Sequence, residues 1–586
     1  MVFTNPFACE GDTELPASIL GNVFQDQNSD CLFNAGDSGK QGWAVSASDG
    51  VNTFWGTTNA DGAYAIGLLP GTYDIVLSNP VMLWGGCPDT IYDVQATLQN
   101  FGTADFGLQP QILCTSMQVD LSAASLRRCF NNQYKVQYCN NGTINAENAY
   151  VDIRFDTLCT ILSSPIPWSA VNGNTYTFPL GDVAAGACDD FLVLYKVSCD
   201  GVLGQTLCTE AQIFPDTFCS PMGSWSGAKL RVQGHCSGNE VKFVILNQGS
   251  SMAVPSNYIV VEDIVVMTPS LNNPFTLQAG GSEVITVPAN GATWRLEAEQ
   301  PVGYPWGQVA SATVKGCGIN TAGGFSKGFV NQFPLDDQSP FVDIDCREIT
   351  GSFDPNDKQG FPIGVRAEHF IPLDQPLEYL VRFQNTGTDT AFSVVVRDTL
   401  DANFDLETIR ALGASHPYTF NLTGQNIAQF VFANILLPDS NVNEATSHGY
   451  LKFSIRPKKD LLNGTVVENE AAIFFDFNEP VITNKTWHTL GEQYLDISNV
   501  VFSPGIGLEI FPNPASNYAT FLLKSVSPIT GKLTVFDISG RVVGAQDFDH
   551  NQFIFKCSTL NKGCYFFRIT TESQVLAAGK LIVVEH

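Results

Sequence analysis

The chain has 586 residues, of which only 15% are charged, and its formal net charge is −28. A negative field of this size repels phosphate backbones and anionic lipid headgroups, so the composition argues against nucleic-acid binding and unassisted membrane binding. No uninterrupted apolar run reaches the roughly 18 residues that a membrane helix requires, so the chain is not predicted to span a membrane.

Cysteines are concentrated in the first part of the chain. Fourteen of the 16 lie between Cys9 and Cys346, and the other two are Cys557 and Cys564. No Cys-x-x-Cys pair occurs and the histidines do not cluster with the cysteines, which argues against zinc. The pattern predicts disulfides formed in an oxidising compartment, each stabilising by roughly 2–5 kcal/mol, with the pairing left open.

The N-terminal segment, MVFTNPFACEGDTELP, has neither a basic nor an apolar region, so it is not a signal peptide. The many cysteines nevertheless favour export, because disulfides form in oxidising compartments. We therefore expect Met1 to be an artificial start or a position within a longer chain.

Short alternating or apolar segments bounded by Gly, Pro, Asn or Asp recur along the chain, and helix signals are nearly absent. Such segments predict β-sandwiches. Examples are residues 73–77, 258–266, 392–396 and 451–455.

An internal repeat occupies residues 134–153, 241–263 and 379–398. Each copy reads as a strand, an Asn-x-Gly turn and a second strand with an acidic residue. We expect the turn to need positive φ, which Asn and Gly tolerate. The spacing of the copies fits one immunoglobulin-sized sandwich per repeat.

The fold class is therefore all-β, with tandem immunoglobulin-like sandwiches arranged as an elongated rod. At roughly 150 residues per domain the length alone predicts about four domains, and the pattern gives five units. They are residues 1–112, 113–224, 225–335, 336–490 and 505–586.

Three stretches resemble known families. Residues 17–108, with TTNADGAYAIGLLPGTYDIVL, resemble the SdrD B-like and Cna B-like modules of bacterial adhesins, which implies a small spacer sandwich. Residues 351–487, with GSFDPNDK and NEAAIFFDFNEPVITN, resemble the conserved-repeat and CARDB-like immunoglobulin domains of proteins exported by type IX secretion. This resemblance implies a fold and no activity.

The last unit carries IFPNPAS, LTVFDISGRVV, LNKGCYFFRI and a terminal KLIVV, and it resembles the type A C-terminal sorting domain of the type IX (Por) secretion system. The resemblance implies recognition by the outer-membrane translocon, cleavage by a sortase-like protease and attachment to surface lipopolysaccharide. Cys564 departs from the motif, and a local bridge with Cys557 is one interpretation.

Asp26, Asn28, Asp30 and Asp37 stand at positions 1, 3, 5 and 12 of a segment, the spacing of oxygen ligands in a calcium loop. Cys31 stands where glycine usually makes the turn, and the closing residue is Asp rather than Glu. Two interpretations stay open: a Ca²⁺ site, the one cofactor expected, and a metal-free loop of Asx turns.

Other candidate sites have plainer interpretations. Ser415-His416 and Ser447-His448, with Asp439, are more simply hydrogen-bonded turns than catalytic groups, because no Gly-x-Ser-x-Gly elbow exists. An acidic stretch from Asp336 to Asp357 fits no ligand template and is interpreted as a solvated linker.

Two lysines and four tryptophans also have plainer interpretations. Lys40 and Lys358 invite comparison with the Lys–Asn isopeptide bonds of some Cna B-like modules, but such a bond requires a buried lysine beside an asparagine and a carboxylate, and we do not expect one. Four tryptophans, Trp43, Trp55, Trp84 and Trp306, are interpreted as core rather than as a sugar platform.

These features predict a secreted, non-enzymatic, structural or adhesive surface protein, with assembly into a filament or surface layer by self-association as a variant. One alternative is the accessory and sorting region of a larger exported hydrolase. Another is a glycan-binding module.

Overall fold

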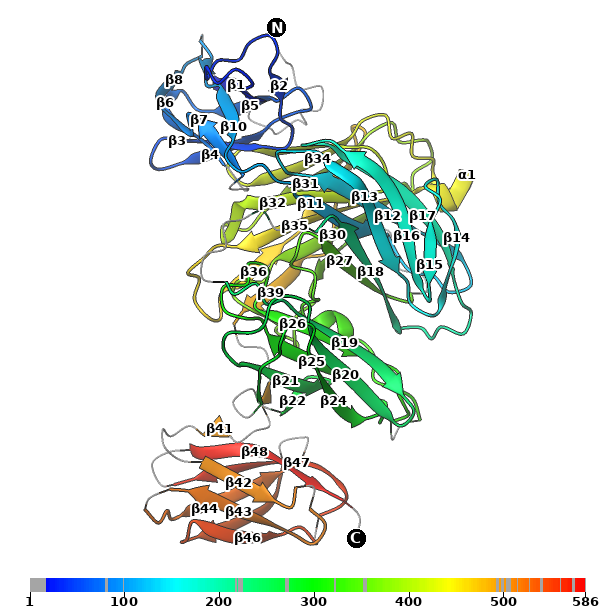
Figure 1. The fold of residues 1–586 in the computed structure, drawn as a ribbon, viewed down its shortest axis with the longest axis vertical. Helices are drawn as coiled ribbons and strands as arrows, with labels where there is room; N and C mark the ends of the chain where they lie inside the picture. The colour runs from blue at the N-terminus through cyan, green and yellow to red at the C-terminus, as the bar shows by residue number, and fades with distance from the viewer. Residues whose placement is uncertain are drawn as a thin grey trace. The chain divides into compact units, whose positions relative to one another are not determined.

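The computed structural model describes residues 17–584 except for short gaps, which are 79–82, 99, 217–218, 220–224, 269–272, 321–322, 351–355, 492–494, 497–499, 502–506, 514, 526, 538–540, 559 and 572–574. Within this part the all-β prediction is confirmed (Figure 1). The helical elements described are α1 (Ser440–Asn443) and two 3₁₀ turns, η2 (Val330–Gln332) and η3 (Glu444–Thr446). None of them is long and apolar enough to cross a membrane.

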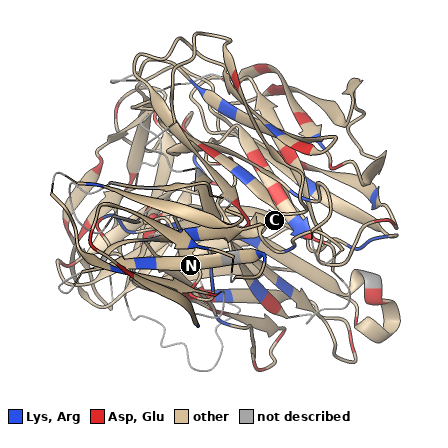
Figure 2. Ribbon diagram, turned by 90° about the horizontal axis from the view of Figure 1, so that it is seen from below, with Lys and Arg blue, Asp and Glu red and all other residues tan. Residues whose placement is uncertain are grey.

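The strands form because apolar side chains alternate with polar ones. In β12 (Asn131–Asn140), Tyr134, Val136 and Tyr138 are buried while the residues between them are more exposed. A period of two places one set of side chains on the core face. The uncharged polar residues on the outer faces leave most of the ribbon without charge (Figure 2).

The first sandwich packs two sheets around a core that includes Ile19, Ile66, Ile75 and Phe106. One sheet follows the order β2 (Ser38–Gly39), β1 (Ala17–Gln25), β10 (Phe106–Pro110), β7 (Trp84–Cys87), with β5 (Ala63–Leu68) and β9 (Gly102–Thr103) also paired to β1. The other follows β4 (Thr53–Thr57), β3 (Ala44–Ser48), β6 (Gly71–Leu77), β8 (Thr90–Ala96).

The second sandwich takes its last strand from a distant part of the chain. One sheet is β11 (Met117–Ser122), β12, β17 (Cys188–Val197), β14 (Cys159–Ser163). The other is β15 (Ala170–Asn172), β16 (Thr175–Val183), β13 (Ala146–Arg154), β18 (Thr206–Phe214), β27 (Val342–Glu348). The boundary expected at residue 336 therefore precedes a strand that belongs to the second sandwich.

The third sandwich is encoded between β18 and β27, except for its last strand at Leu495–Asp496. Its sheets are β19 (Leu230–Ser237), β20 (Glu240–Asn247), β24 (Ser282–Pro288), and β26 (Val309–Val314), β25 (Trp294–Glu299), β21 (Ser256–Glu262), β22 (Val265–Thr268), β40 (Leu495–Asp496), with β23 (Pro274–Phe275) on β21. Residues 258–266, expected as one strand, are a hairpin because Asp263 adopts φ 53°. Its carboxylate accepts from Thr293 N and Ser326 Oγ.

The fourth sandwich has a core rich in aromatic residues, including Tyr379, Phe383, Phe430 and Phe453. Its sheets are β28 (Asp357–Phe361), β30 (Leu377–Gln384), β35 (His448–Pro457), β32 (Phe404–Ala414), and β33 (Thr419–Thr423), β34 (Ile427–Phe432), β31 (Val394–Thr399), β37 (Ala471–Phe475), β38 (Val481–Ile482). A small sheet joins β29 (Phe370–Ile371), β39 (Thr486–Leu490) and β36 (Val466–Asn469).

The fifth sandwich closes the chain. Its sheets are β42 (Gly507–Phe511), β43 (Tyr518–Lys524), β46 (Gln552–Lys556), and β41 (Val500–Val501), β48 (Val575–Val583), β47 (Gly563–Thr570), β44 (Gly531–Phe536), β45 (Val542–Phe548). Phe521 stacks with Phe553 and meets Phe567 edge-on in its core.

The chain forms two compact units, each larger than one sandwich. The first unit contains Met1–Gly223 and Lys327–Gln493, and the second unit contains Ser224–Ser326 and Tyr494–His586. Within the former, β4 of the first sandwich lies against β33 of the fourth: Trp55 N donates to Gly424 O, and Trp55 packs on the fourth core. Neighbouring sandwiches of this unit therefore share hydrogen bonds and apolar contacts.

The predicted disulfide framework is present. Six bridges are described, namely Cys31–Cys87, Cys114–Cys219, Cys129–Cys199, Cys139–Cys188, Cys208–Cys346 and Cys236–Cys317. Cys208 and Cys346 face each other across β18 and β27, so this bridge fastens the returning strand. Cys9 and the side chain of Cys564 lie outside the described residues, and with them the expected Cys557–Cys564 bridge.

The internal repeat has a common buried asparagine. Asn140, Asn247 and Asn385 each end or directly follow the first strand of a copy, and each amide group donates to two or more backbone carbonyls of later segments. The expected positive φ at the glycines is wrong. A Cβ on Gly142 would lie 2.3 Å from Cys114 O, and one on Gly249 would lie 2.1 Å from Gly227 O. At these two positions glycine is required because another backbone passes close by.

Candidate functional site

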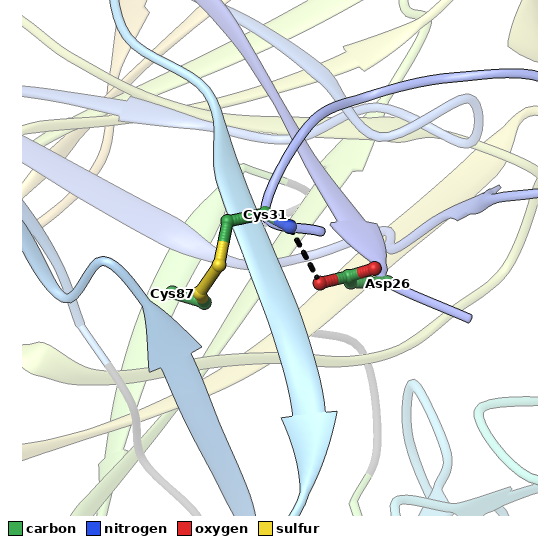
Figure 3. A group of neighbouring side chains, drawn as sticks. All are labelled: Asp26, Cys31 and Cys87. Atoms are coloured by element: carbon green, nitrogen blue, oxygen red, sulfur yellow. Dashed lines mark hydrogen bonds between the residues drawn. A yellow bond between two sulfur atoms is a disulfide. The ribbon is translucent and has the colours of Figure 1, made fainter. Parts of the chain in front are cut away.

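The loop after β1 is built around the Asp26 carboxylate (Figure 3). Asp26 Oδ1 accepts from Ser29 N at 2.8 Å, and Oδ2 accepts from Cys31 N and from Gln109 Nε2, both at 3.0 Å. The Gln109 amide, with support from the backbone N–H groups of the loop, lowers the pKa of Asp26 in spite of its burial. Ser29 and Cys31 have positive φ, so the loop turns without the expected glycine.

The other three predicted calcium ligands also accept hydrogen bonds within the loop. Asp30 accepts from Leu32 N and from the amides of Asn28 and Asn34, and Asp37 accepts from Gln27 N and Asn34 N. The sulfurs nearest to Asp26 belong to the Cys31–Cys87 disulfide, so neither is a thiolate ligand. The geometry is that of a polar loop of Asx turns, and calcium binding by these four residues stays a prediction.

The two Ser-His pairs make hydrogen bonds to turns and backbone. Ser415 Oγ lies 2.9 Å from His416 Nδ1 and also accepts from Tyr450 N, while Ser447 Oγ donates to Glu444 O. Asp439 accepts from Asn441 N and Val442 N at the start of α1. The contacts of Asp439 are with the backbone of its own helix, as expected for a capping residue.

Three of the four tryptophans named in the sequence pack on the cores of sandwiches. Trp84 is buried in the first core, Trp43 packs against that core, and Trp55 packs on the fourth. Trp306 lies edge-on to Tyr304, at a centroid distance of 5.8 Å. Lys40 Nζ lies 4.7 Å from the centroid of a Trp84 ring, which is a cation–π contact.

The acidic stretch interpreted as a solvated linker is partly buried, so that interpretation is wrong for its centre. Asp343 and Asp345 lie on β27, where Asp345 pairs with Arg347 and Asp343 lies 3.5 Å from Lys452 Nζ. Burial raises the pKa of Asp343 well above its usual range. Asp354 lies outside the described residues. Sequence spacing did not reveal this cluster because its cation stands more than 100 residues away.

Buried polar side chains of the fourth sandwich were also missed. Asp398 and Asn469 occupy core positions, and with Lys358 they form a cluster inside the sandwich. The sequence contained a signal for Asp398 and Asn469. Each stands two residues after a buried valine, at a position where strand alternation predicts another apolar residue.

In the fifth sandwich the motif residues hold the end of the chain. Asn513 of the IFPNPAS motif donates to Lys580 O and accepts from Ile582 N, so it ties the turn before β43 to β48. Tyr565 of the LNKGCYFFRI motif donates to Asn561 O at 2.8 Å. The sequence motifs are therefore the turns and edges that fix the terminal strand in the sheet.

Comparison with known families supports two of the predicted resemblances. Residues 354–489 match a domain of unknown function (DUF7619), and residues 509–584 match the secretion system C-terminal sorting domain. These ranges agree with the stretches 351–487 and 505–586 expected from the motifs. No curated protein matches the chain.

Solved structures of pilins and adhesins are similar over parts of the chain. The full-length major pilin SpaD from Corynebacterium diphtheriae is 10% identical, covering 50% of this chain and 90% of that one, with a TM-score of 0.17. The major pilin subunit BcpA of Bacillus cereus is 13% identical, covering 58% and 94%, with a TM-score of 0.16. The collagen adhesin CNA from S. aureus is 7% identical, covering 64% and 93%, with a TM-score of 0.17.

Similarity at this level assigns no function, whereas the tail match is specific. Through residues 509–584 the chain carries a C-terminal sorting domain of the type IX secretion system, and it is a protein exported to the cell surface or the extracellular space.

Proposed function

We propose that this protein is a structural or adhesive component of the bacterial surface, in which the sandwiches before residue 494 form the displayed part and residues 505–586 serve as the export address. The translocon reads the fifth sandwich, a sortase-like protease removes it, and the remainder is attached to surface lipopolysaccharide. The displayed sandwiches then either associate with further copies of the chain or bind surface glycans.

The observation that carries this proposal is the way in which sandwiches of the first unit are fastened together. The second sandwich is completed by β27, and the Cys208–Cys346 bridge holds that strand in place. The first and fourth sandwiches share hydrogen bonds, including Trp55 N to Gly424 O. Fastened modules resist bending and forced separation, which suits a part that must bear load outside the cell.

The test isolates the protein from the surface of its native cells and examines it by electron microscopy and intact-mass analysis. A mass lacking residues from about 505 onward, with single particles on the surface, supports a displayed adhesin. Regular fibres with the same truncation support a filament subunit. Recovery as the end of a larger polypeptide with a catalytic domain would favour the hydrolase alternative.

A matched pair of strains tests the export address. Cells expressing the chain without residues 505–586 are expected to retain the protein inside, whereas cells expressing the full chain display it. Equal display by both strains would contradict the proposed role of the fifth sandwich.

A further inference from the structure

Three polar side chains lie in the apolar core of the fourth sandwich. Lys358 is 1% exposed, Asp398 is 0% exposed and Asn469 is 2% exposed. Lys358 lies on β28 in one sheet and Asp398 on β31 in the facing sheet, and Lys358 Nζ contacts Asp398 Oδ2. A buried charged group costs several kcal/mol unless it is paired and hydrogen-bonded, so such a cluster requires a reason.

Strand register places the asparagine beside the carboxylate. Asp398 is paired with Ala471 of β37, and Asn469 stands two residues before Ala471 at the next inward-facing position. Asn469 ends β36 just before β37 begins, and it lies near enough to Asp398 to lower the pKa of that carboxyl. Tyr379 lies beside this group: its ring centroid is 4.6 Å from Lys358 Nζ, and the Asn469 amide influences the pKa of both Tyr379 and Asp398.

The hydrogen bonding of this cluster is incomplete. Neither the oxygen nor the nitrogen of the Asn469 side chain makes a hydrogen bond of good geometry, and the same holds for Asp398 Oδ1 and the Tyr379 hydroxyl, although Asn469 lies near enough to both groups to lower their pKa values. Buried amides are nearly always satisfied, since an unpaired buried polar group costs about 1–3 kcal/mol. An unsatisfied asparagine amide next to a buried lysine and a carboxyl is the arrangement expected before amide transfer, not that of a finished structural network.

Burial also favours the neutral forms of Lys358 and Asp398. It lowers the pKa of Lys358, against the attraction of Asp398, which favours the neutral amine that acts as a nucleophile. It raises the pKa of Asp398, against the effects of Lys358 and Asn469, which favours the protonated acid. A neutral amine and a neutral carboxylic acid are the forms that aminolysis of an amide needs.

Contrary to the expectation from the sequence, we propose that Lys358 and Asn469 become joined by an intramolecular isopeptide bond, with Asp398 as the catalytic acid and base. Lys358 Nζ attacks Asn469 Cγ while Asp398 donates its proton to the amide oxygen. Asp398 then transfers a proton from Nζ to the departing nitrogen, and the oxygen returns its proton to Asp398 as the carbonyl re-forms. The Nζ–Cγ bond forms, the Cγ–Nδ2 bond breaks and one ammonia is released, so no oxidant, reductant or other reactant is consumed.

Such a bond would covalently cross-link β28, the first strand of the fourth sandwich in the sequence, to the end of β36, more than 100 residues later. No cysteine occurs between residues 347 and 556, a range that includes all strands of the fourth sandwich, so disulfides do not reinforce this sandwich. The bond would give this sandwich a covalent reinforcement that the second and third sandwiches obtain from cysteines.

The test measures the mass of the full chain, purified and fully reduced, and maps its tryptic peptides. The expected result is a mass lower than the sequence mass by one ammonia, with a branched peptide joining the segments that contain Lys358 and Asn469, and no cleavage after Lys358. Because succinimide formation at Asn141-Gly142 or Asn463-Gly464 also releases ammonia, the branched peptide is the decisive readout.

Two asparagine variants provide a matched comparison. Asn469→Ala is expected to abolish the branched peptide, and Asn484→Ala, which alters an asparagine bonded to the Lys358 backbone, is expected to retain it. Asp398→Ala is expected to leave Lys358 and Asn469 unjoined. The wild-type peptide map decides the matter even if a variant does not fold.

Two results would overturn the proposal. One is a wild-type chain of full sequence mass that trypsin cleaves after Lys358. The other is a loss of one water with a Lys358–Asp398 cross-link, which would show that the carboxyl, and not the asparagine, is the acceptor.

Discussion

Lys452 Nζ lies 2.8 Å from Asp120 Oδ1, and this contact joins β35 of the fourth sandwich to β11 of the second. Both side chains are buried. Nζ is also 3.0 Å from Glu378 Oε2 and donates to Leu121 O at 3.0 Å. The surrounding carboxylates raise the pKa of Lys452 well above its usual range in spite of its burial, so the ammonium is charged in the folded protein.

Replacing Lys452 by Met is expected to destabilise the first unit by about 3–5 kcal/mol, because removing one partner leaves buried carboxylates uncompensated. The loss is measured as a shift in the denaturant midpoint. The control is Lys485→Ala, whose partner Glu468 lies 2.8 Å away but whose side chain is 48% exposed. This variant is expected to cost at most about 1 kcal/mol. Equal losses in the two variants would show that the buried cluster is not a joint between the sandwiches.

His488 is expected to make the first unit sensitive to acid. Burial, with a smaller contribution from His369, lowers the pKa of His488 to about 4, and Nε2 contacts Pro362 O. The unfolded chain protonates His488 near pH 6.5, whereas the folded chain protonates it only near pH 4. The contribution of His488 to the free energy of unfolding is therefore complete above pH 6.5 and is lost as the pH falls toward 4.

The contribution of His488 over this window is about 3 kcal/mol. The measurement compares denaturation midpoints at pH 7 and pH 4 for the wild-type protein and His488→Gln, and the variant is expected to show the smaller difference. His550→Gln, at a side chain that is 80% exposed, is the control. A wild-type pH dependence that persists unchanged in His488→Gln would contradict the assignment.

Gly249 is expected to tolerate no side chain. An added Cβ would lie 2.1 Å from Gly227 O and 2.7 Å from Lys229 N, both backbone atoms, so Gly249→Ala must shift a neighbouring segment. Overpacking of this kind costs typically about 1–3 kcal/mol. Gly324→Ala is the control because a Cβ there meets nothing within 4 Å. Thermal unfolding of both variants checks the prediction, which fails if the two melt alike.

Calcium binding at the loop after β1 is testable in the same way. If the predicted ligands bind, calorimetric titration is expected to give a Kd of about 10⁻⁴–10⁻³ M, the range of extracellular modules. Asp30→Ala is expected to abolish the heat of binding. Asp49→Ala removes a carboxylate that likewise accepts from backbone N–H groups in the same sandwich, and it serves as the control. Absence of binding by the wild-type chain would leave the loop as a set of Asx turns.

Local sequence patterns predicted much of the fold for a physical reason. Strand alternation and turn residues act over a few positions, so the strands around Tyr134 or Phe243 follow from period-two burial. The tail motifs were also readable, since Asn513 and Tyr565 fix turns next to their own strands. The prediction of one strand over 258–266 was wrong because Asp263, in the two-residue turn between β21 and β22, is held by partners 30 and 63 residues away.

The sequence by itself determined the all-β class, the disulfide-rich first part and the export address, because composition, cysteine placement and short motifs carry that information directly. Only the tertiary structure decided that β27 completes the second sandwich, which cysteines pair, and that Lys358, Asp398 and Asn469 meet in one core. These relationships join residues 40 or more positions apart. They depend on which strands become neighbours, and no local pattern of side chains specifies that choice.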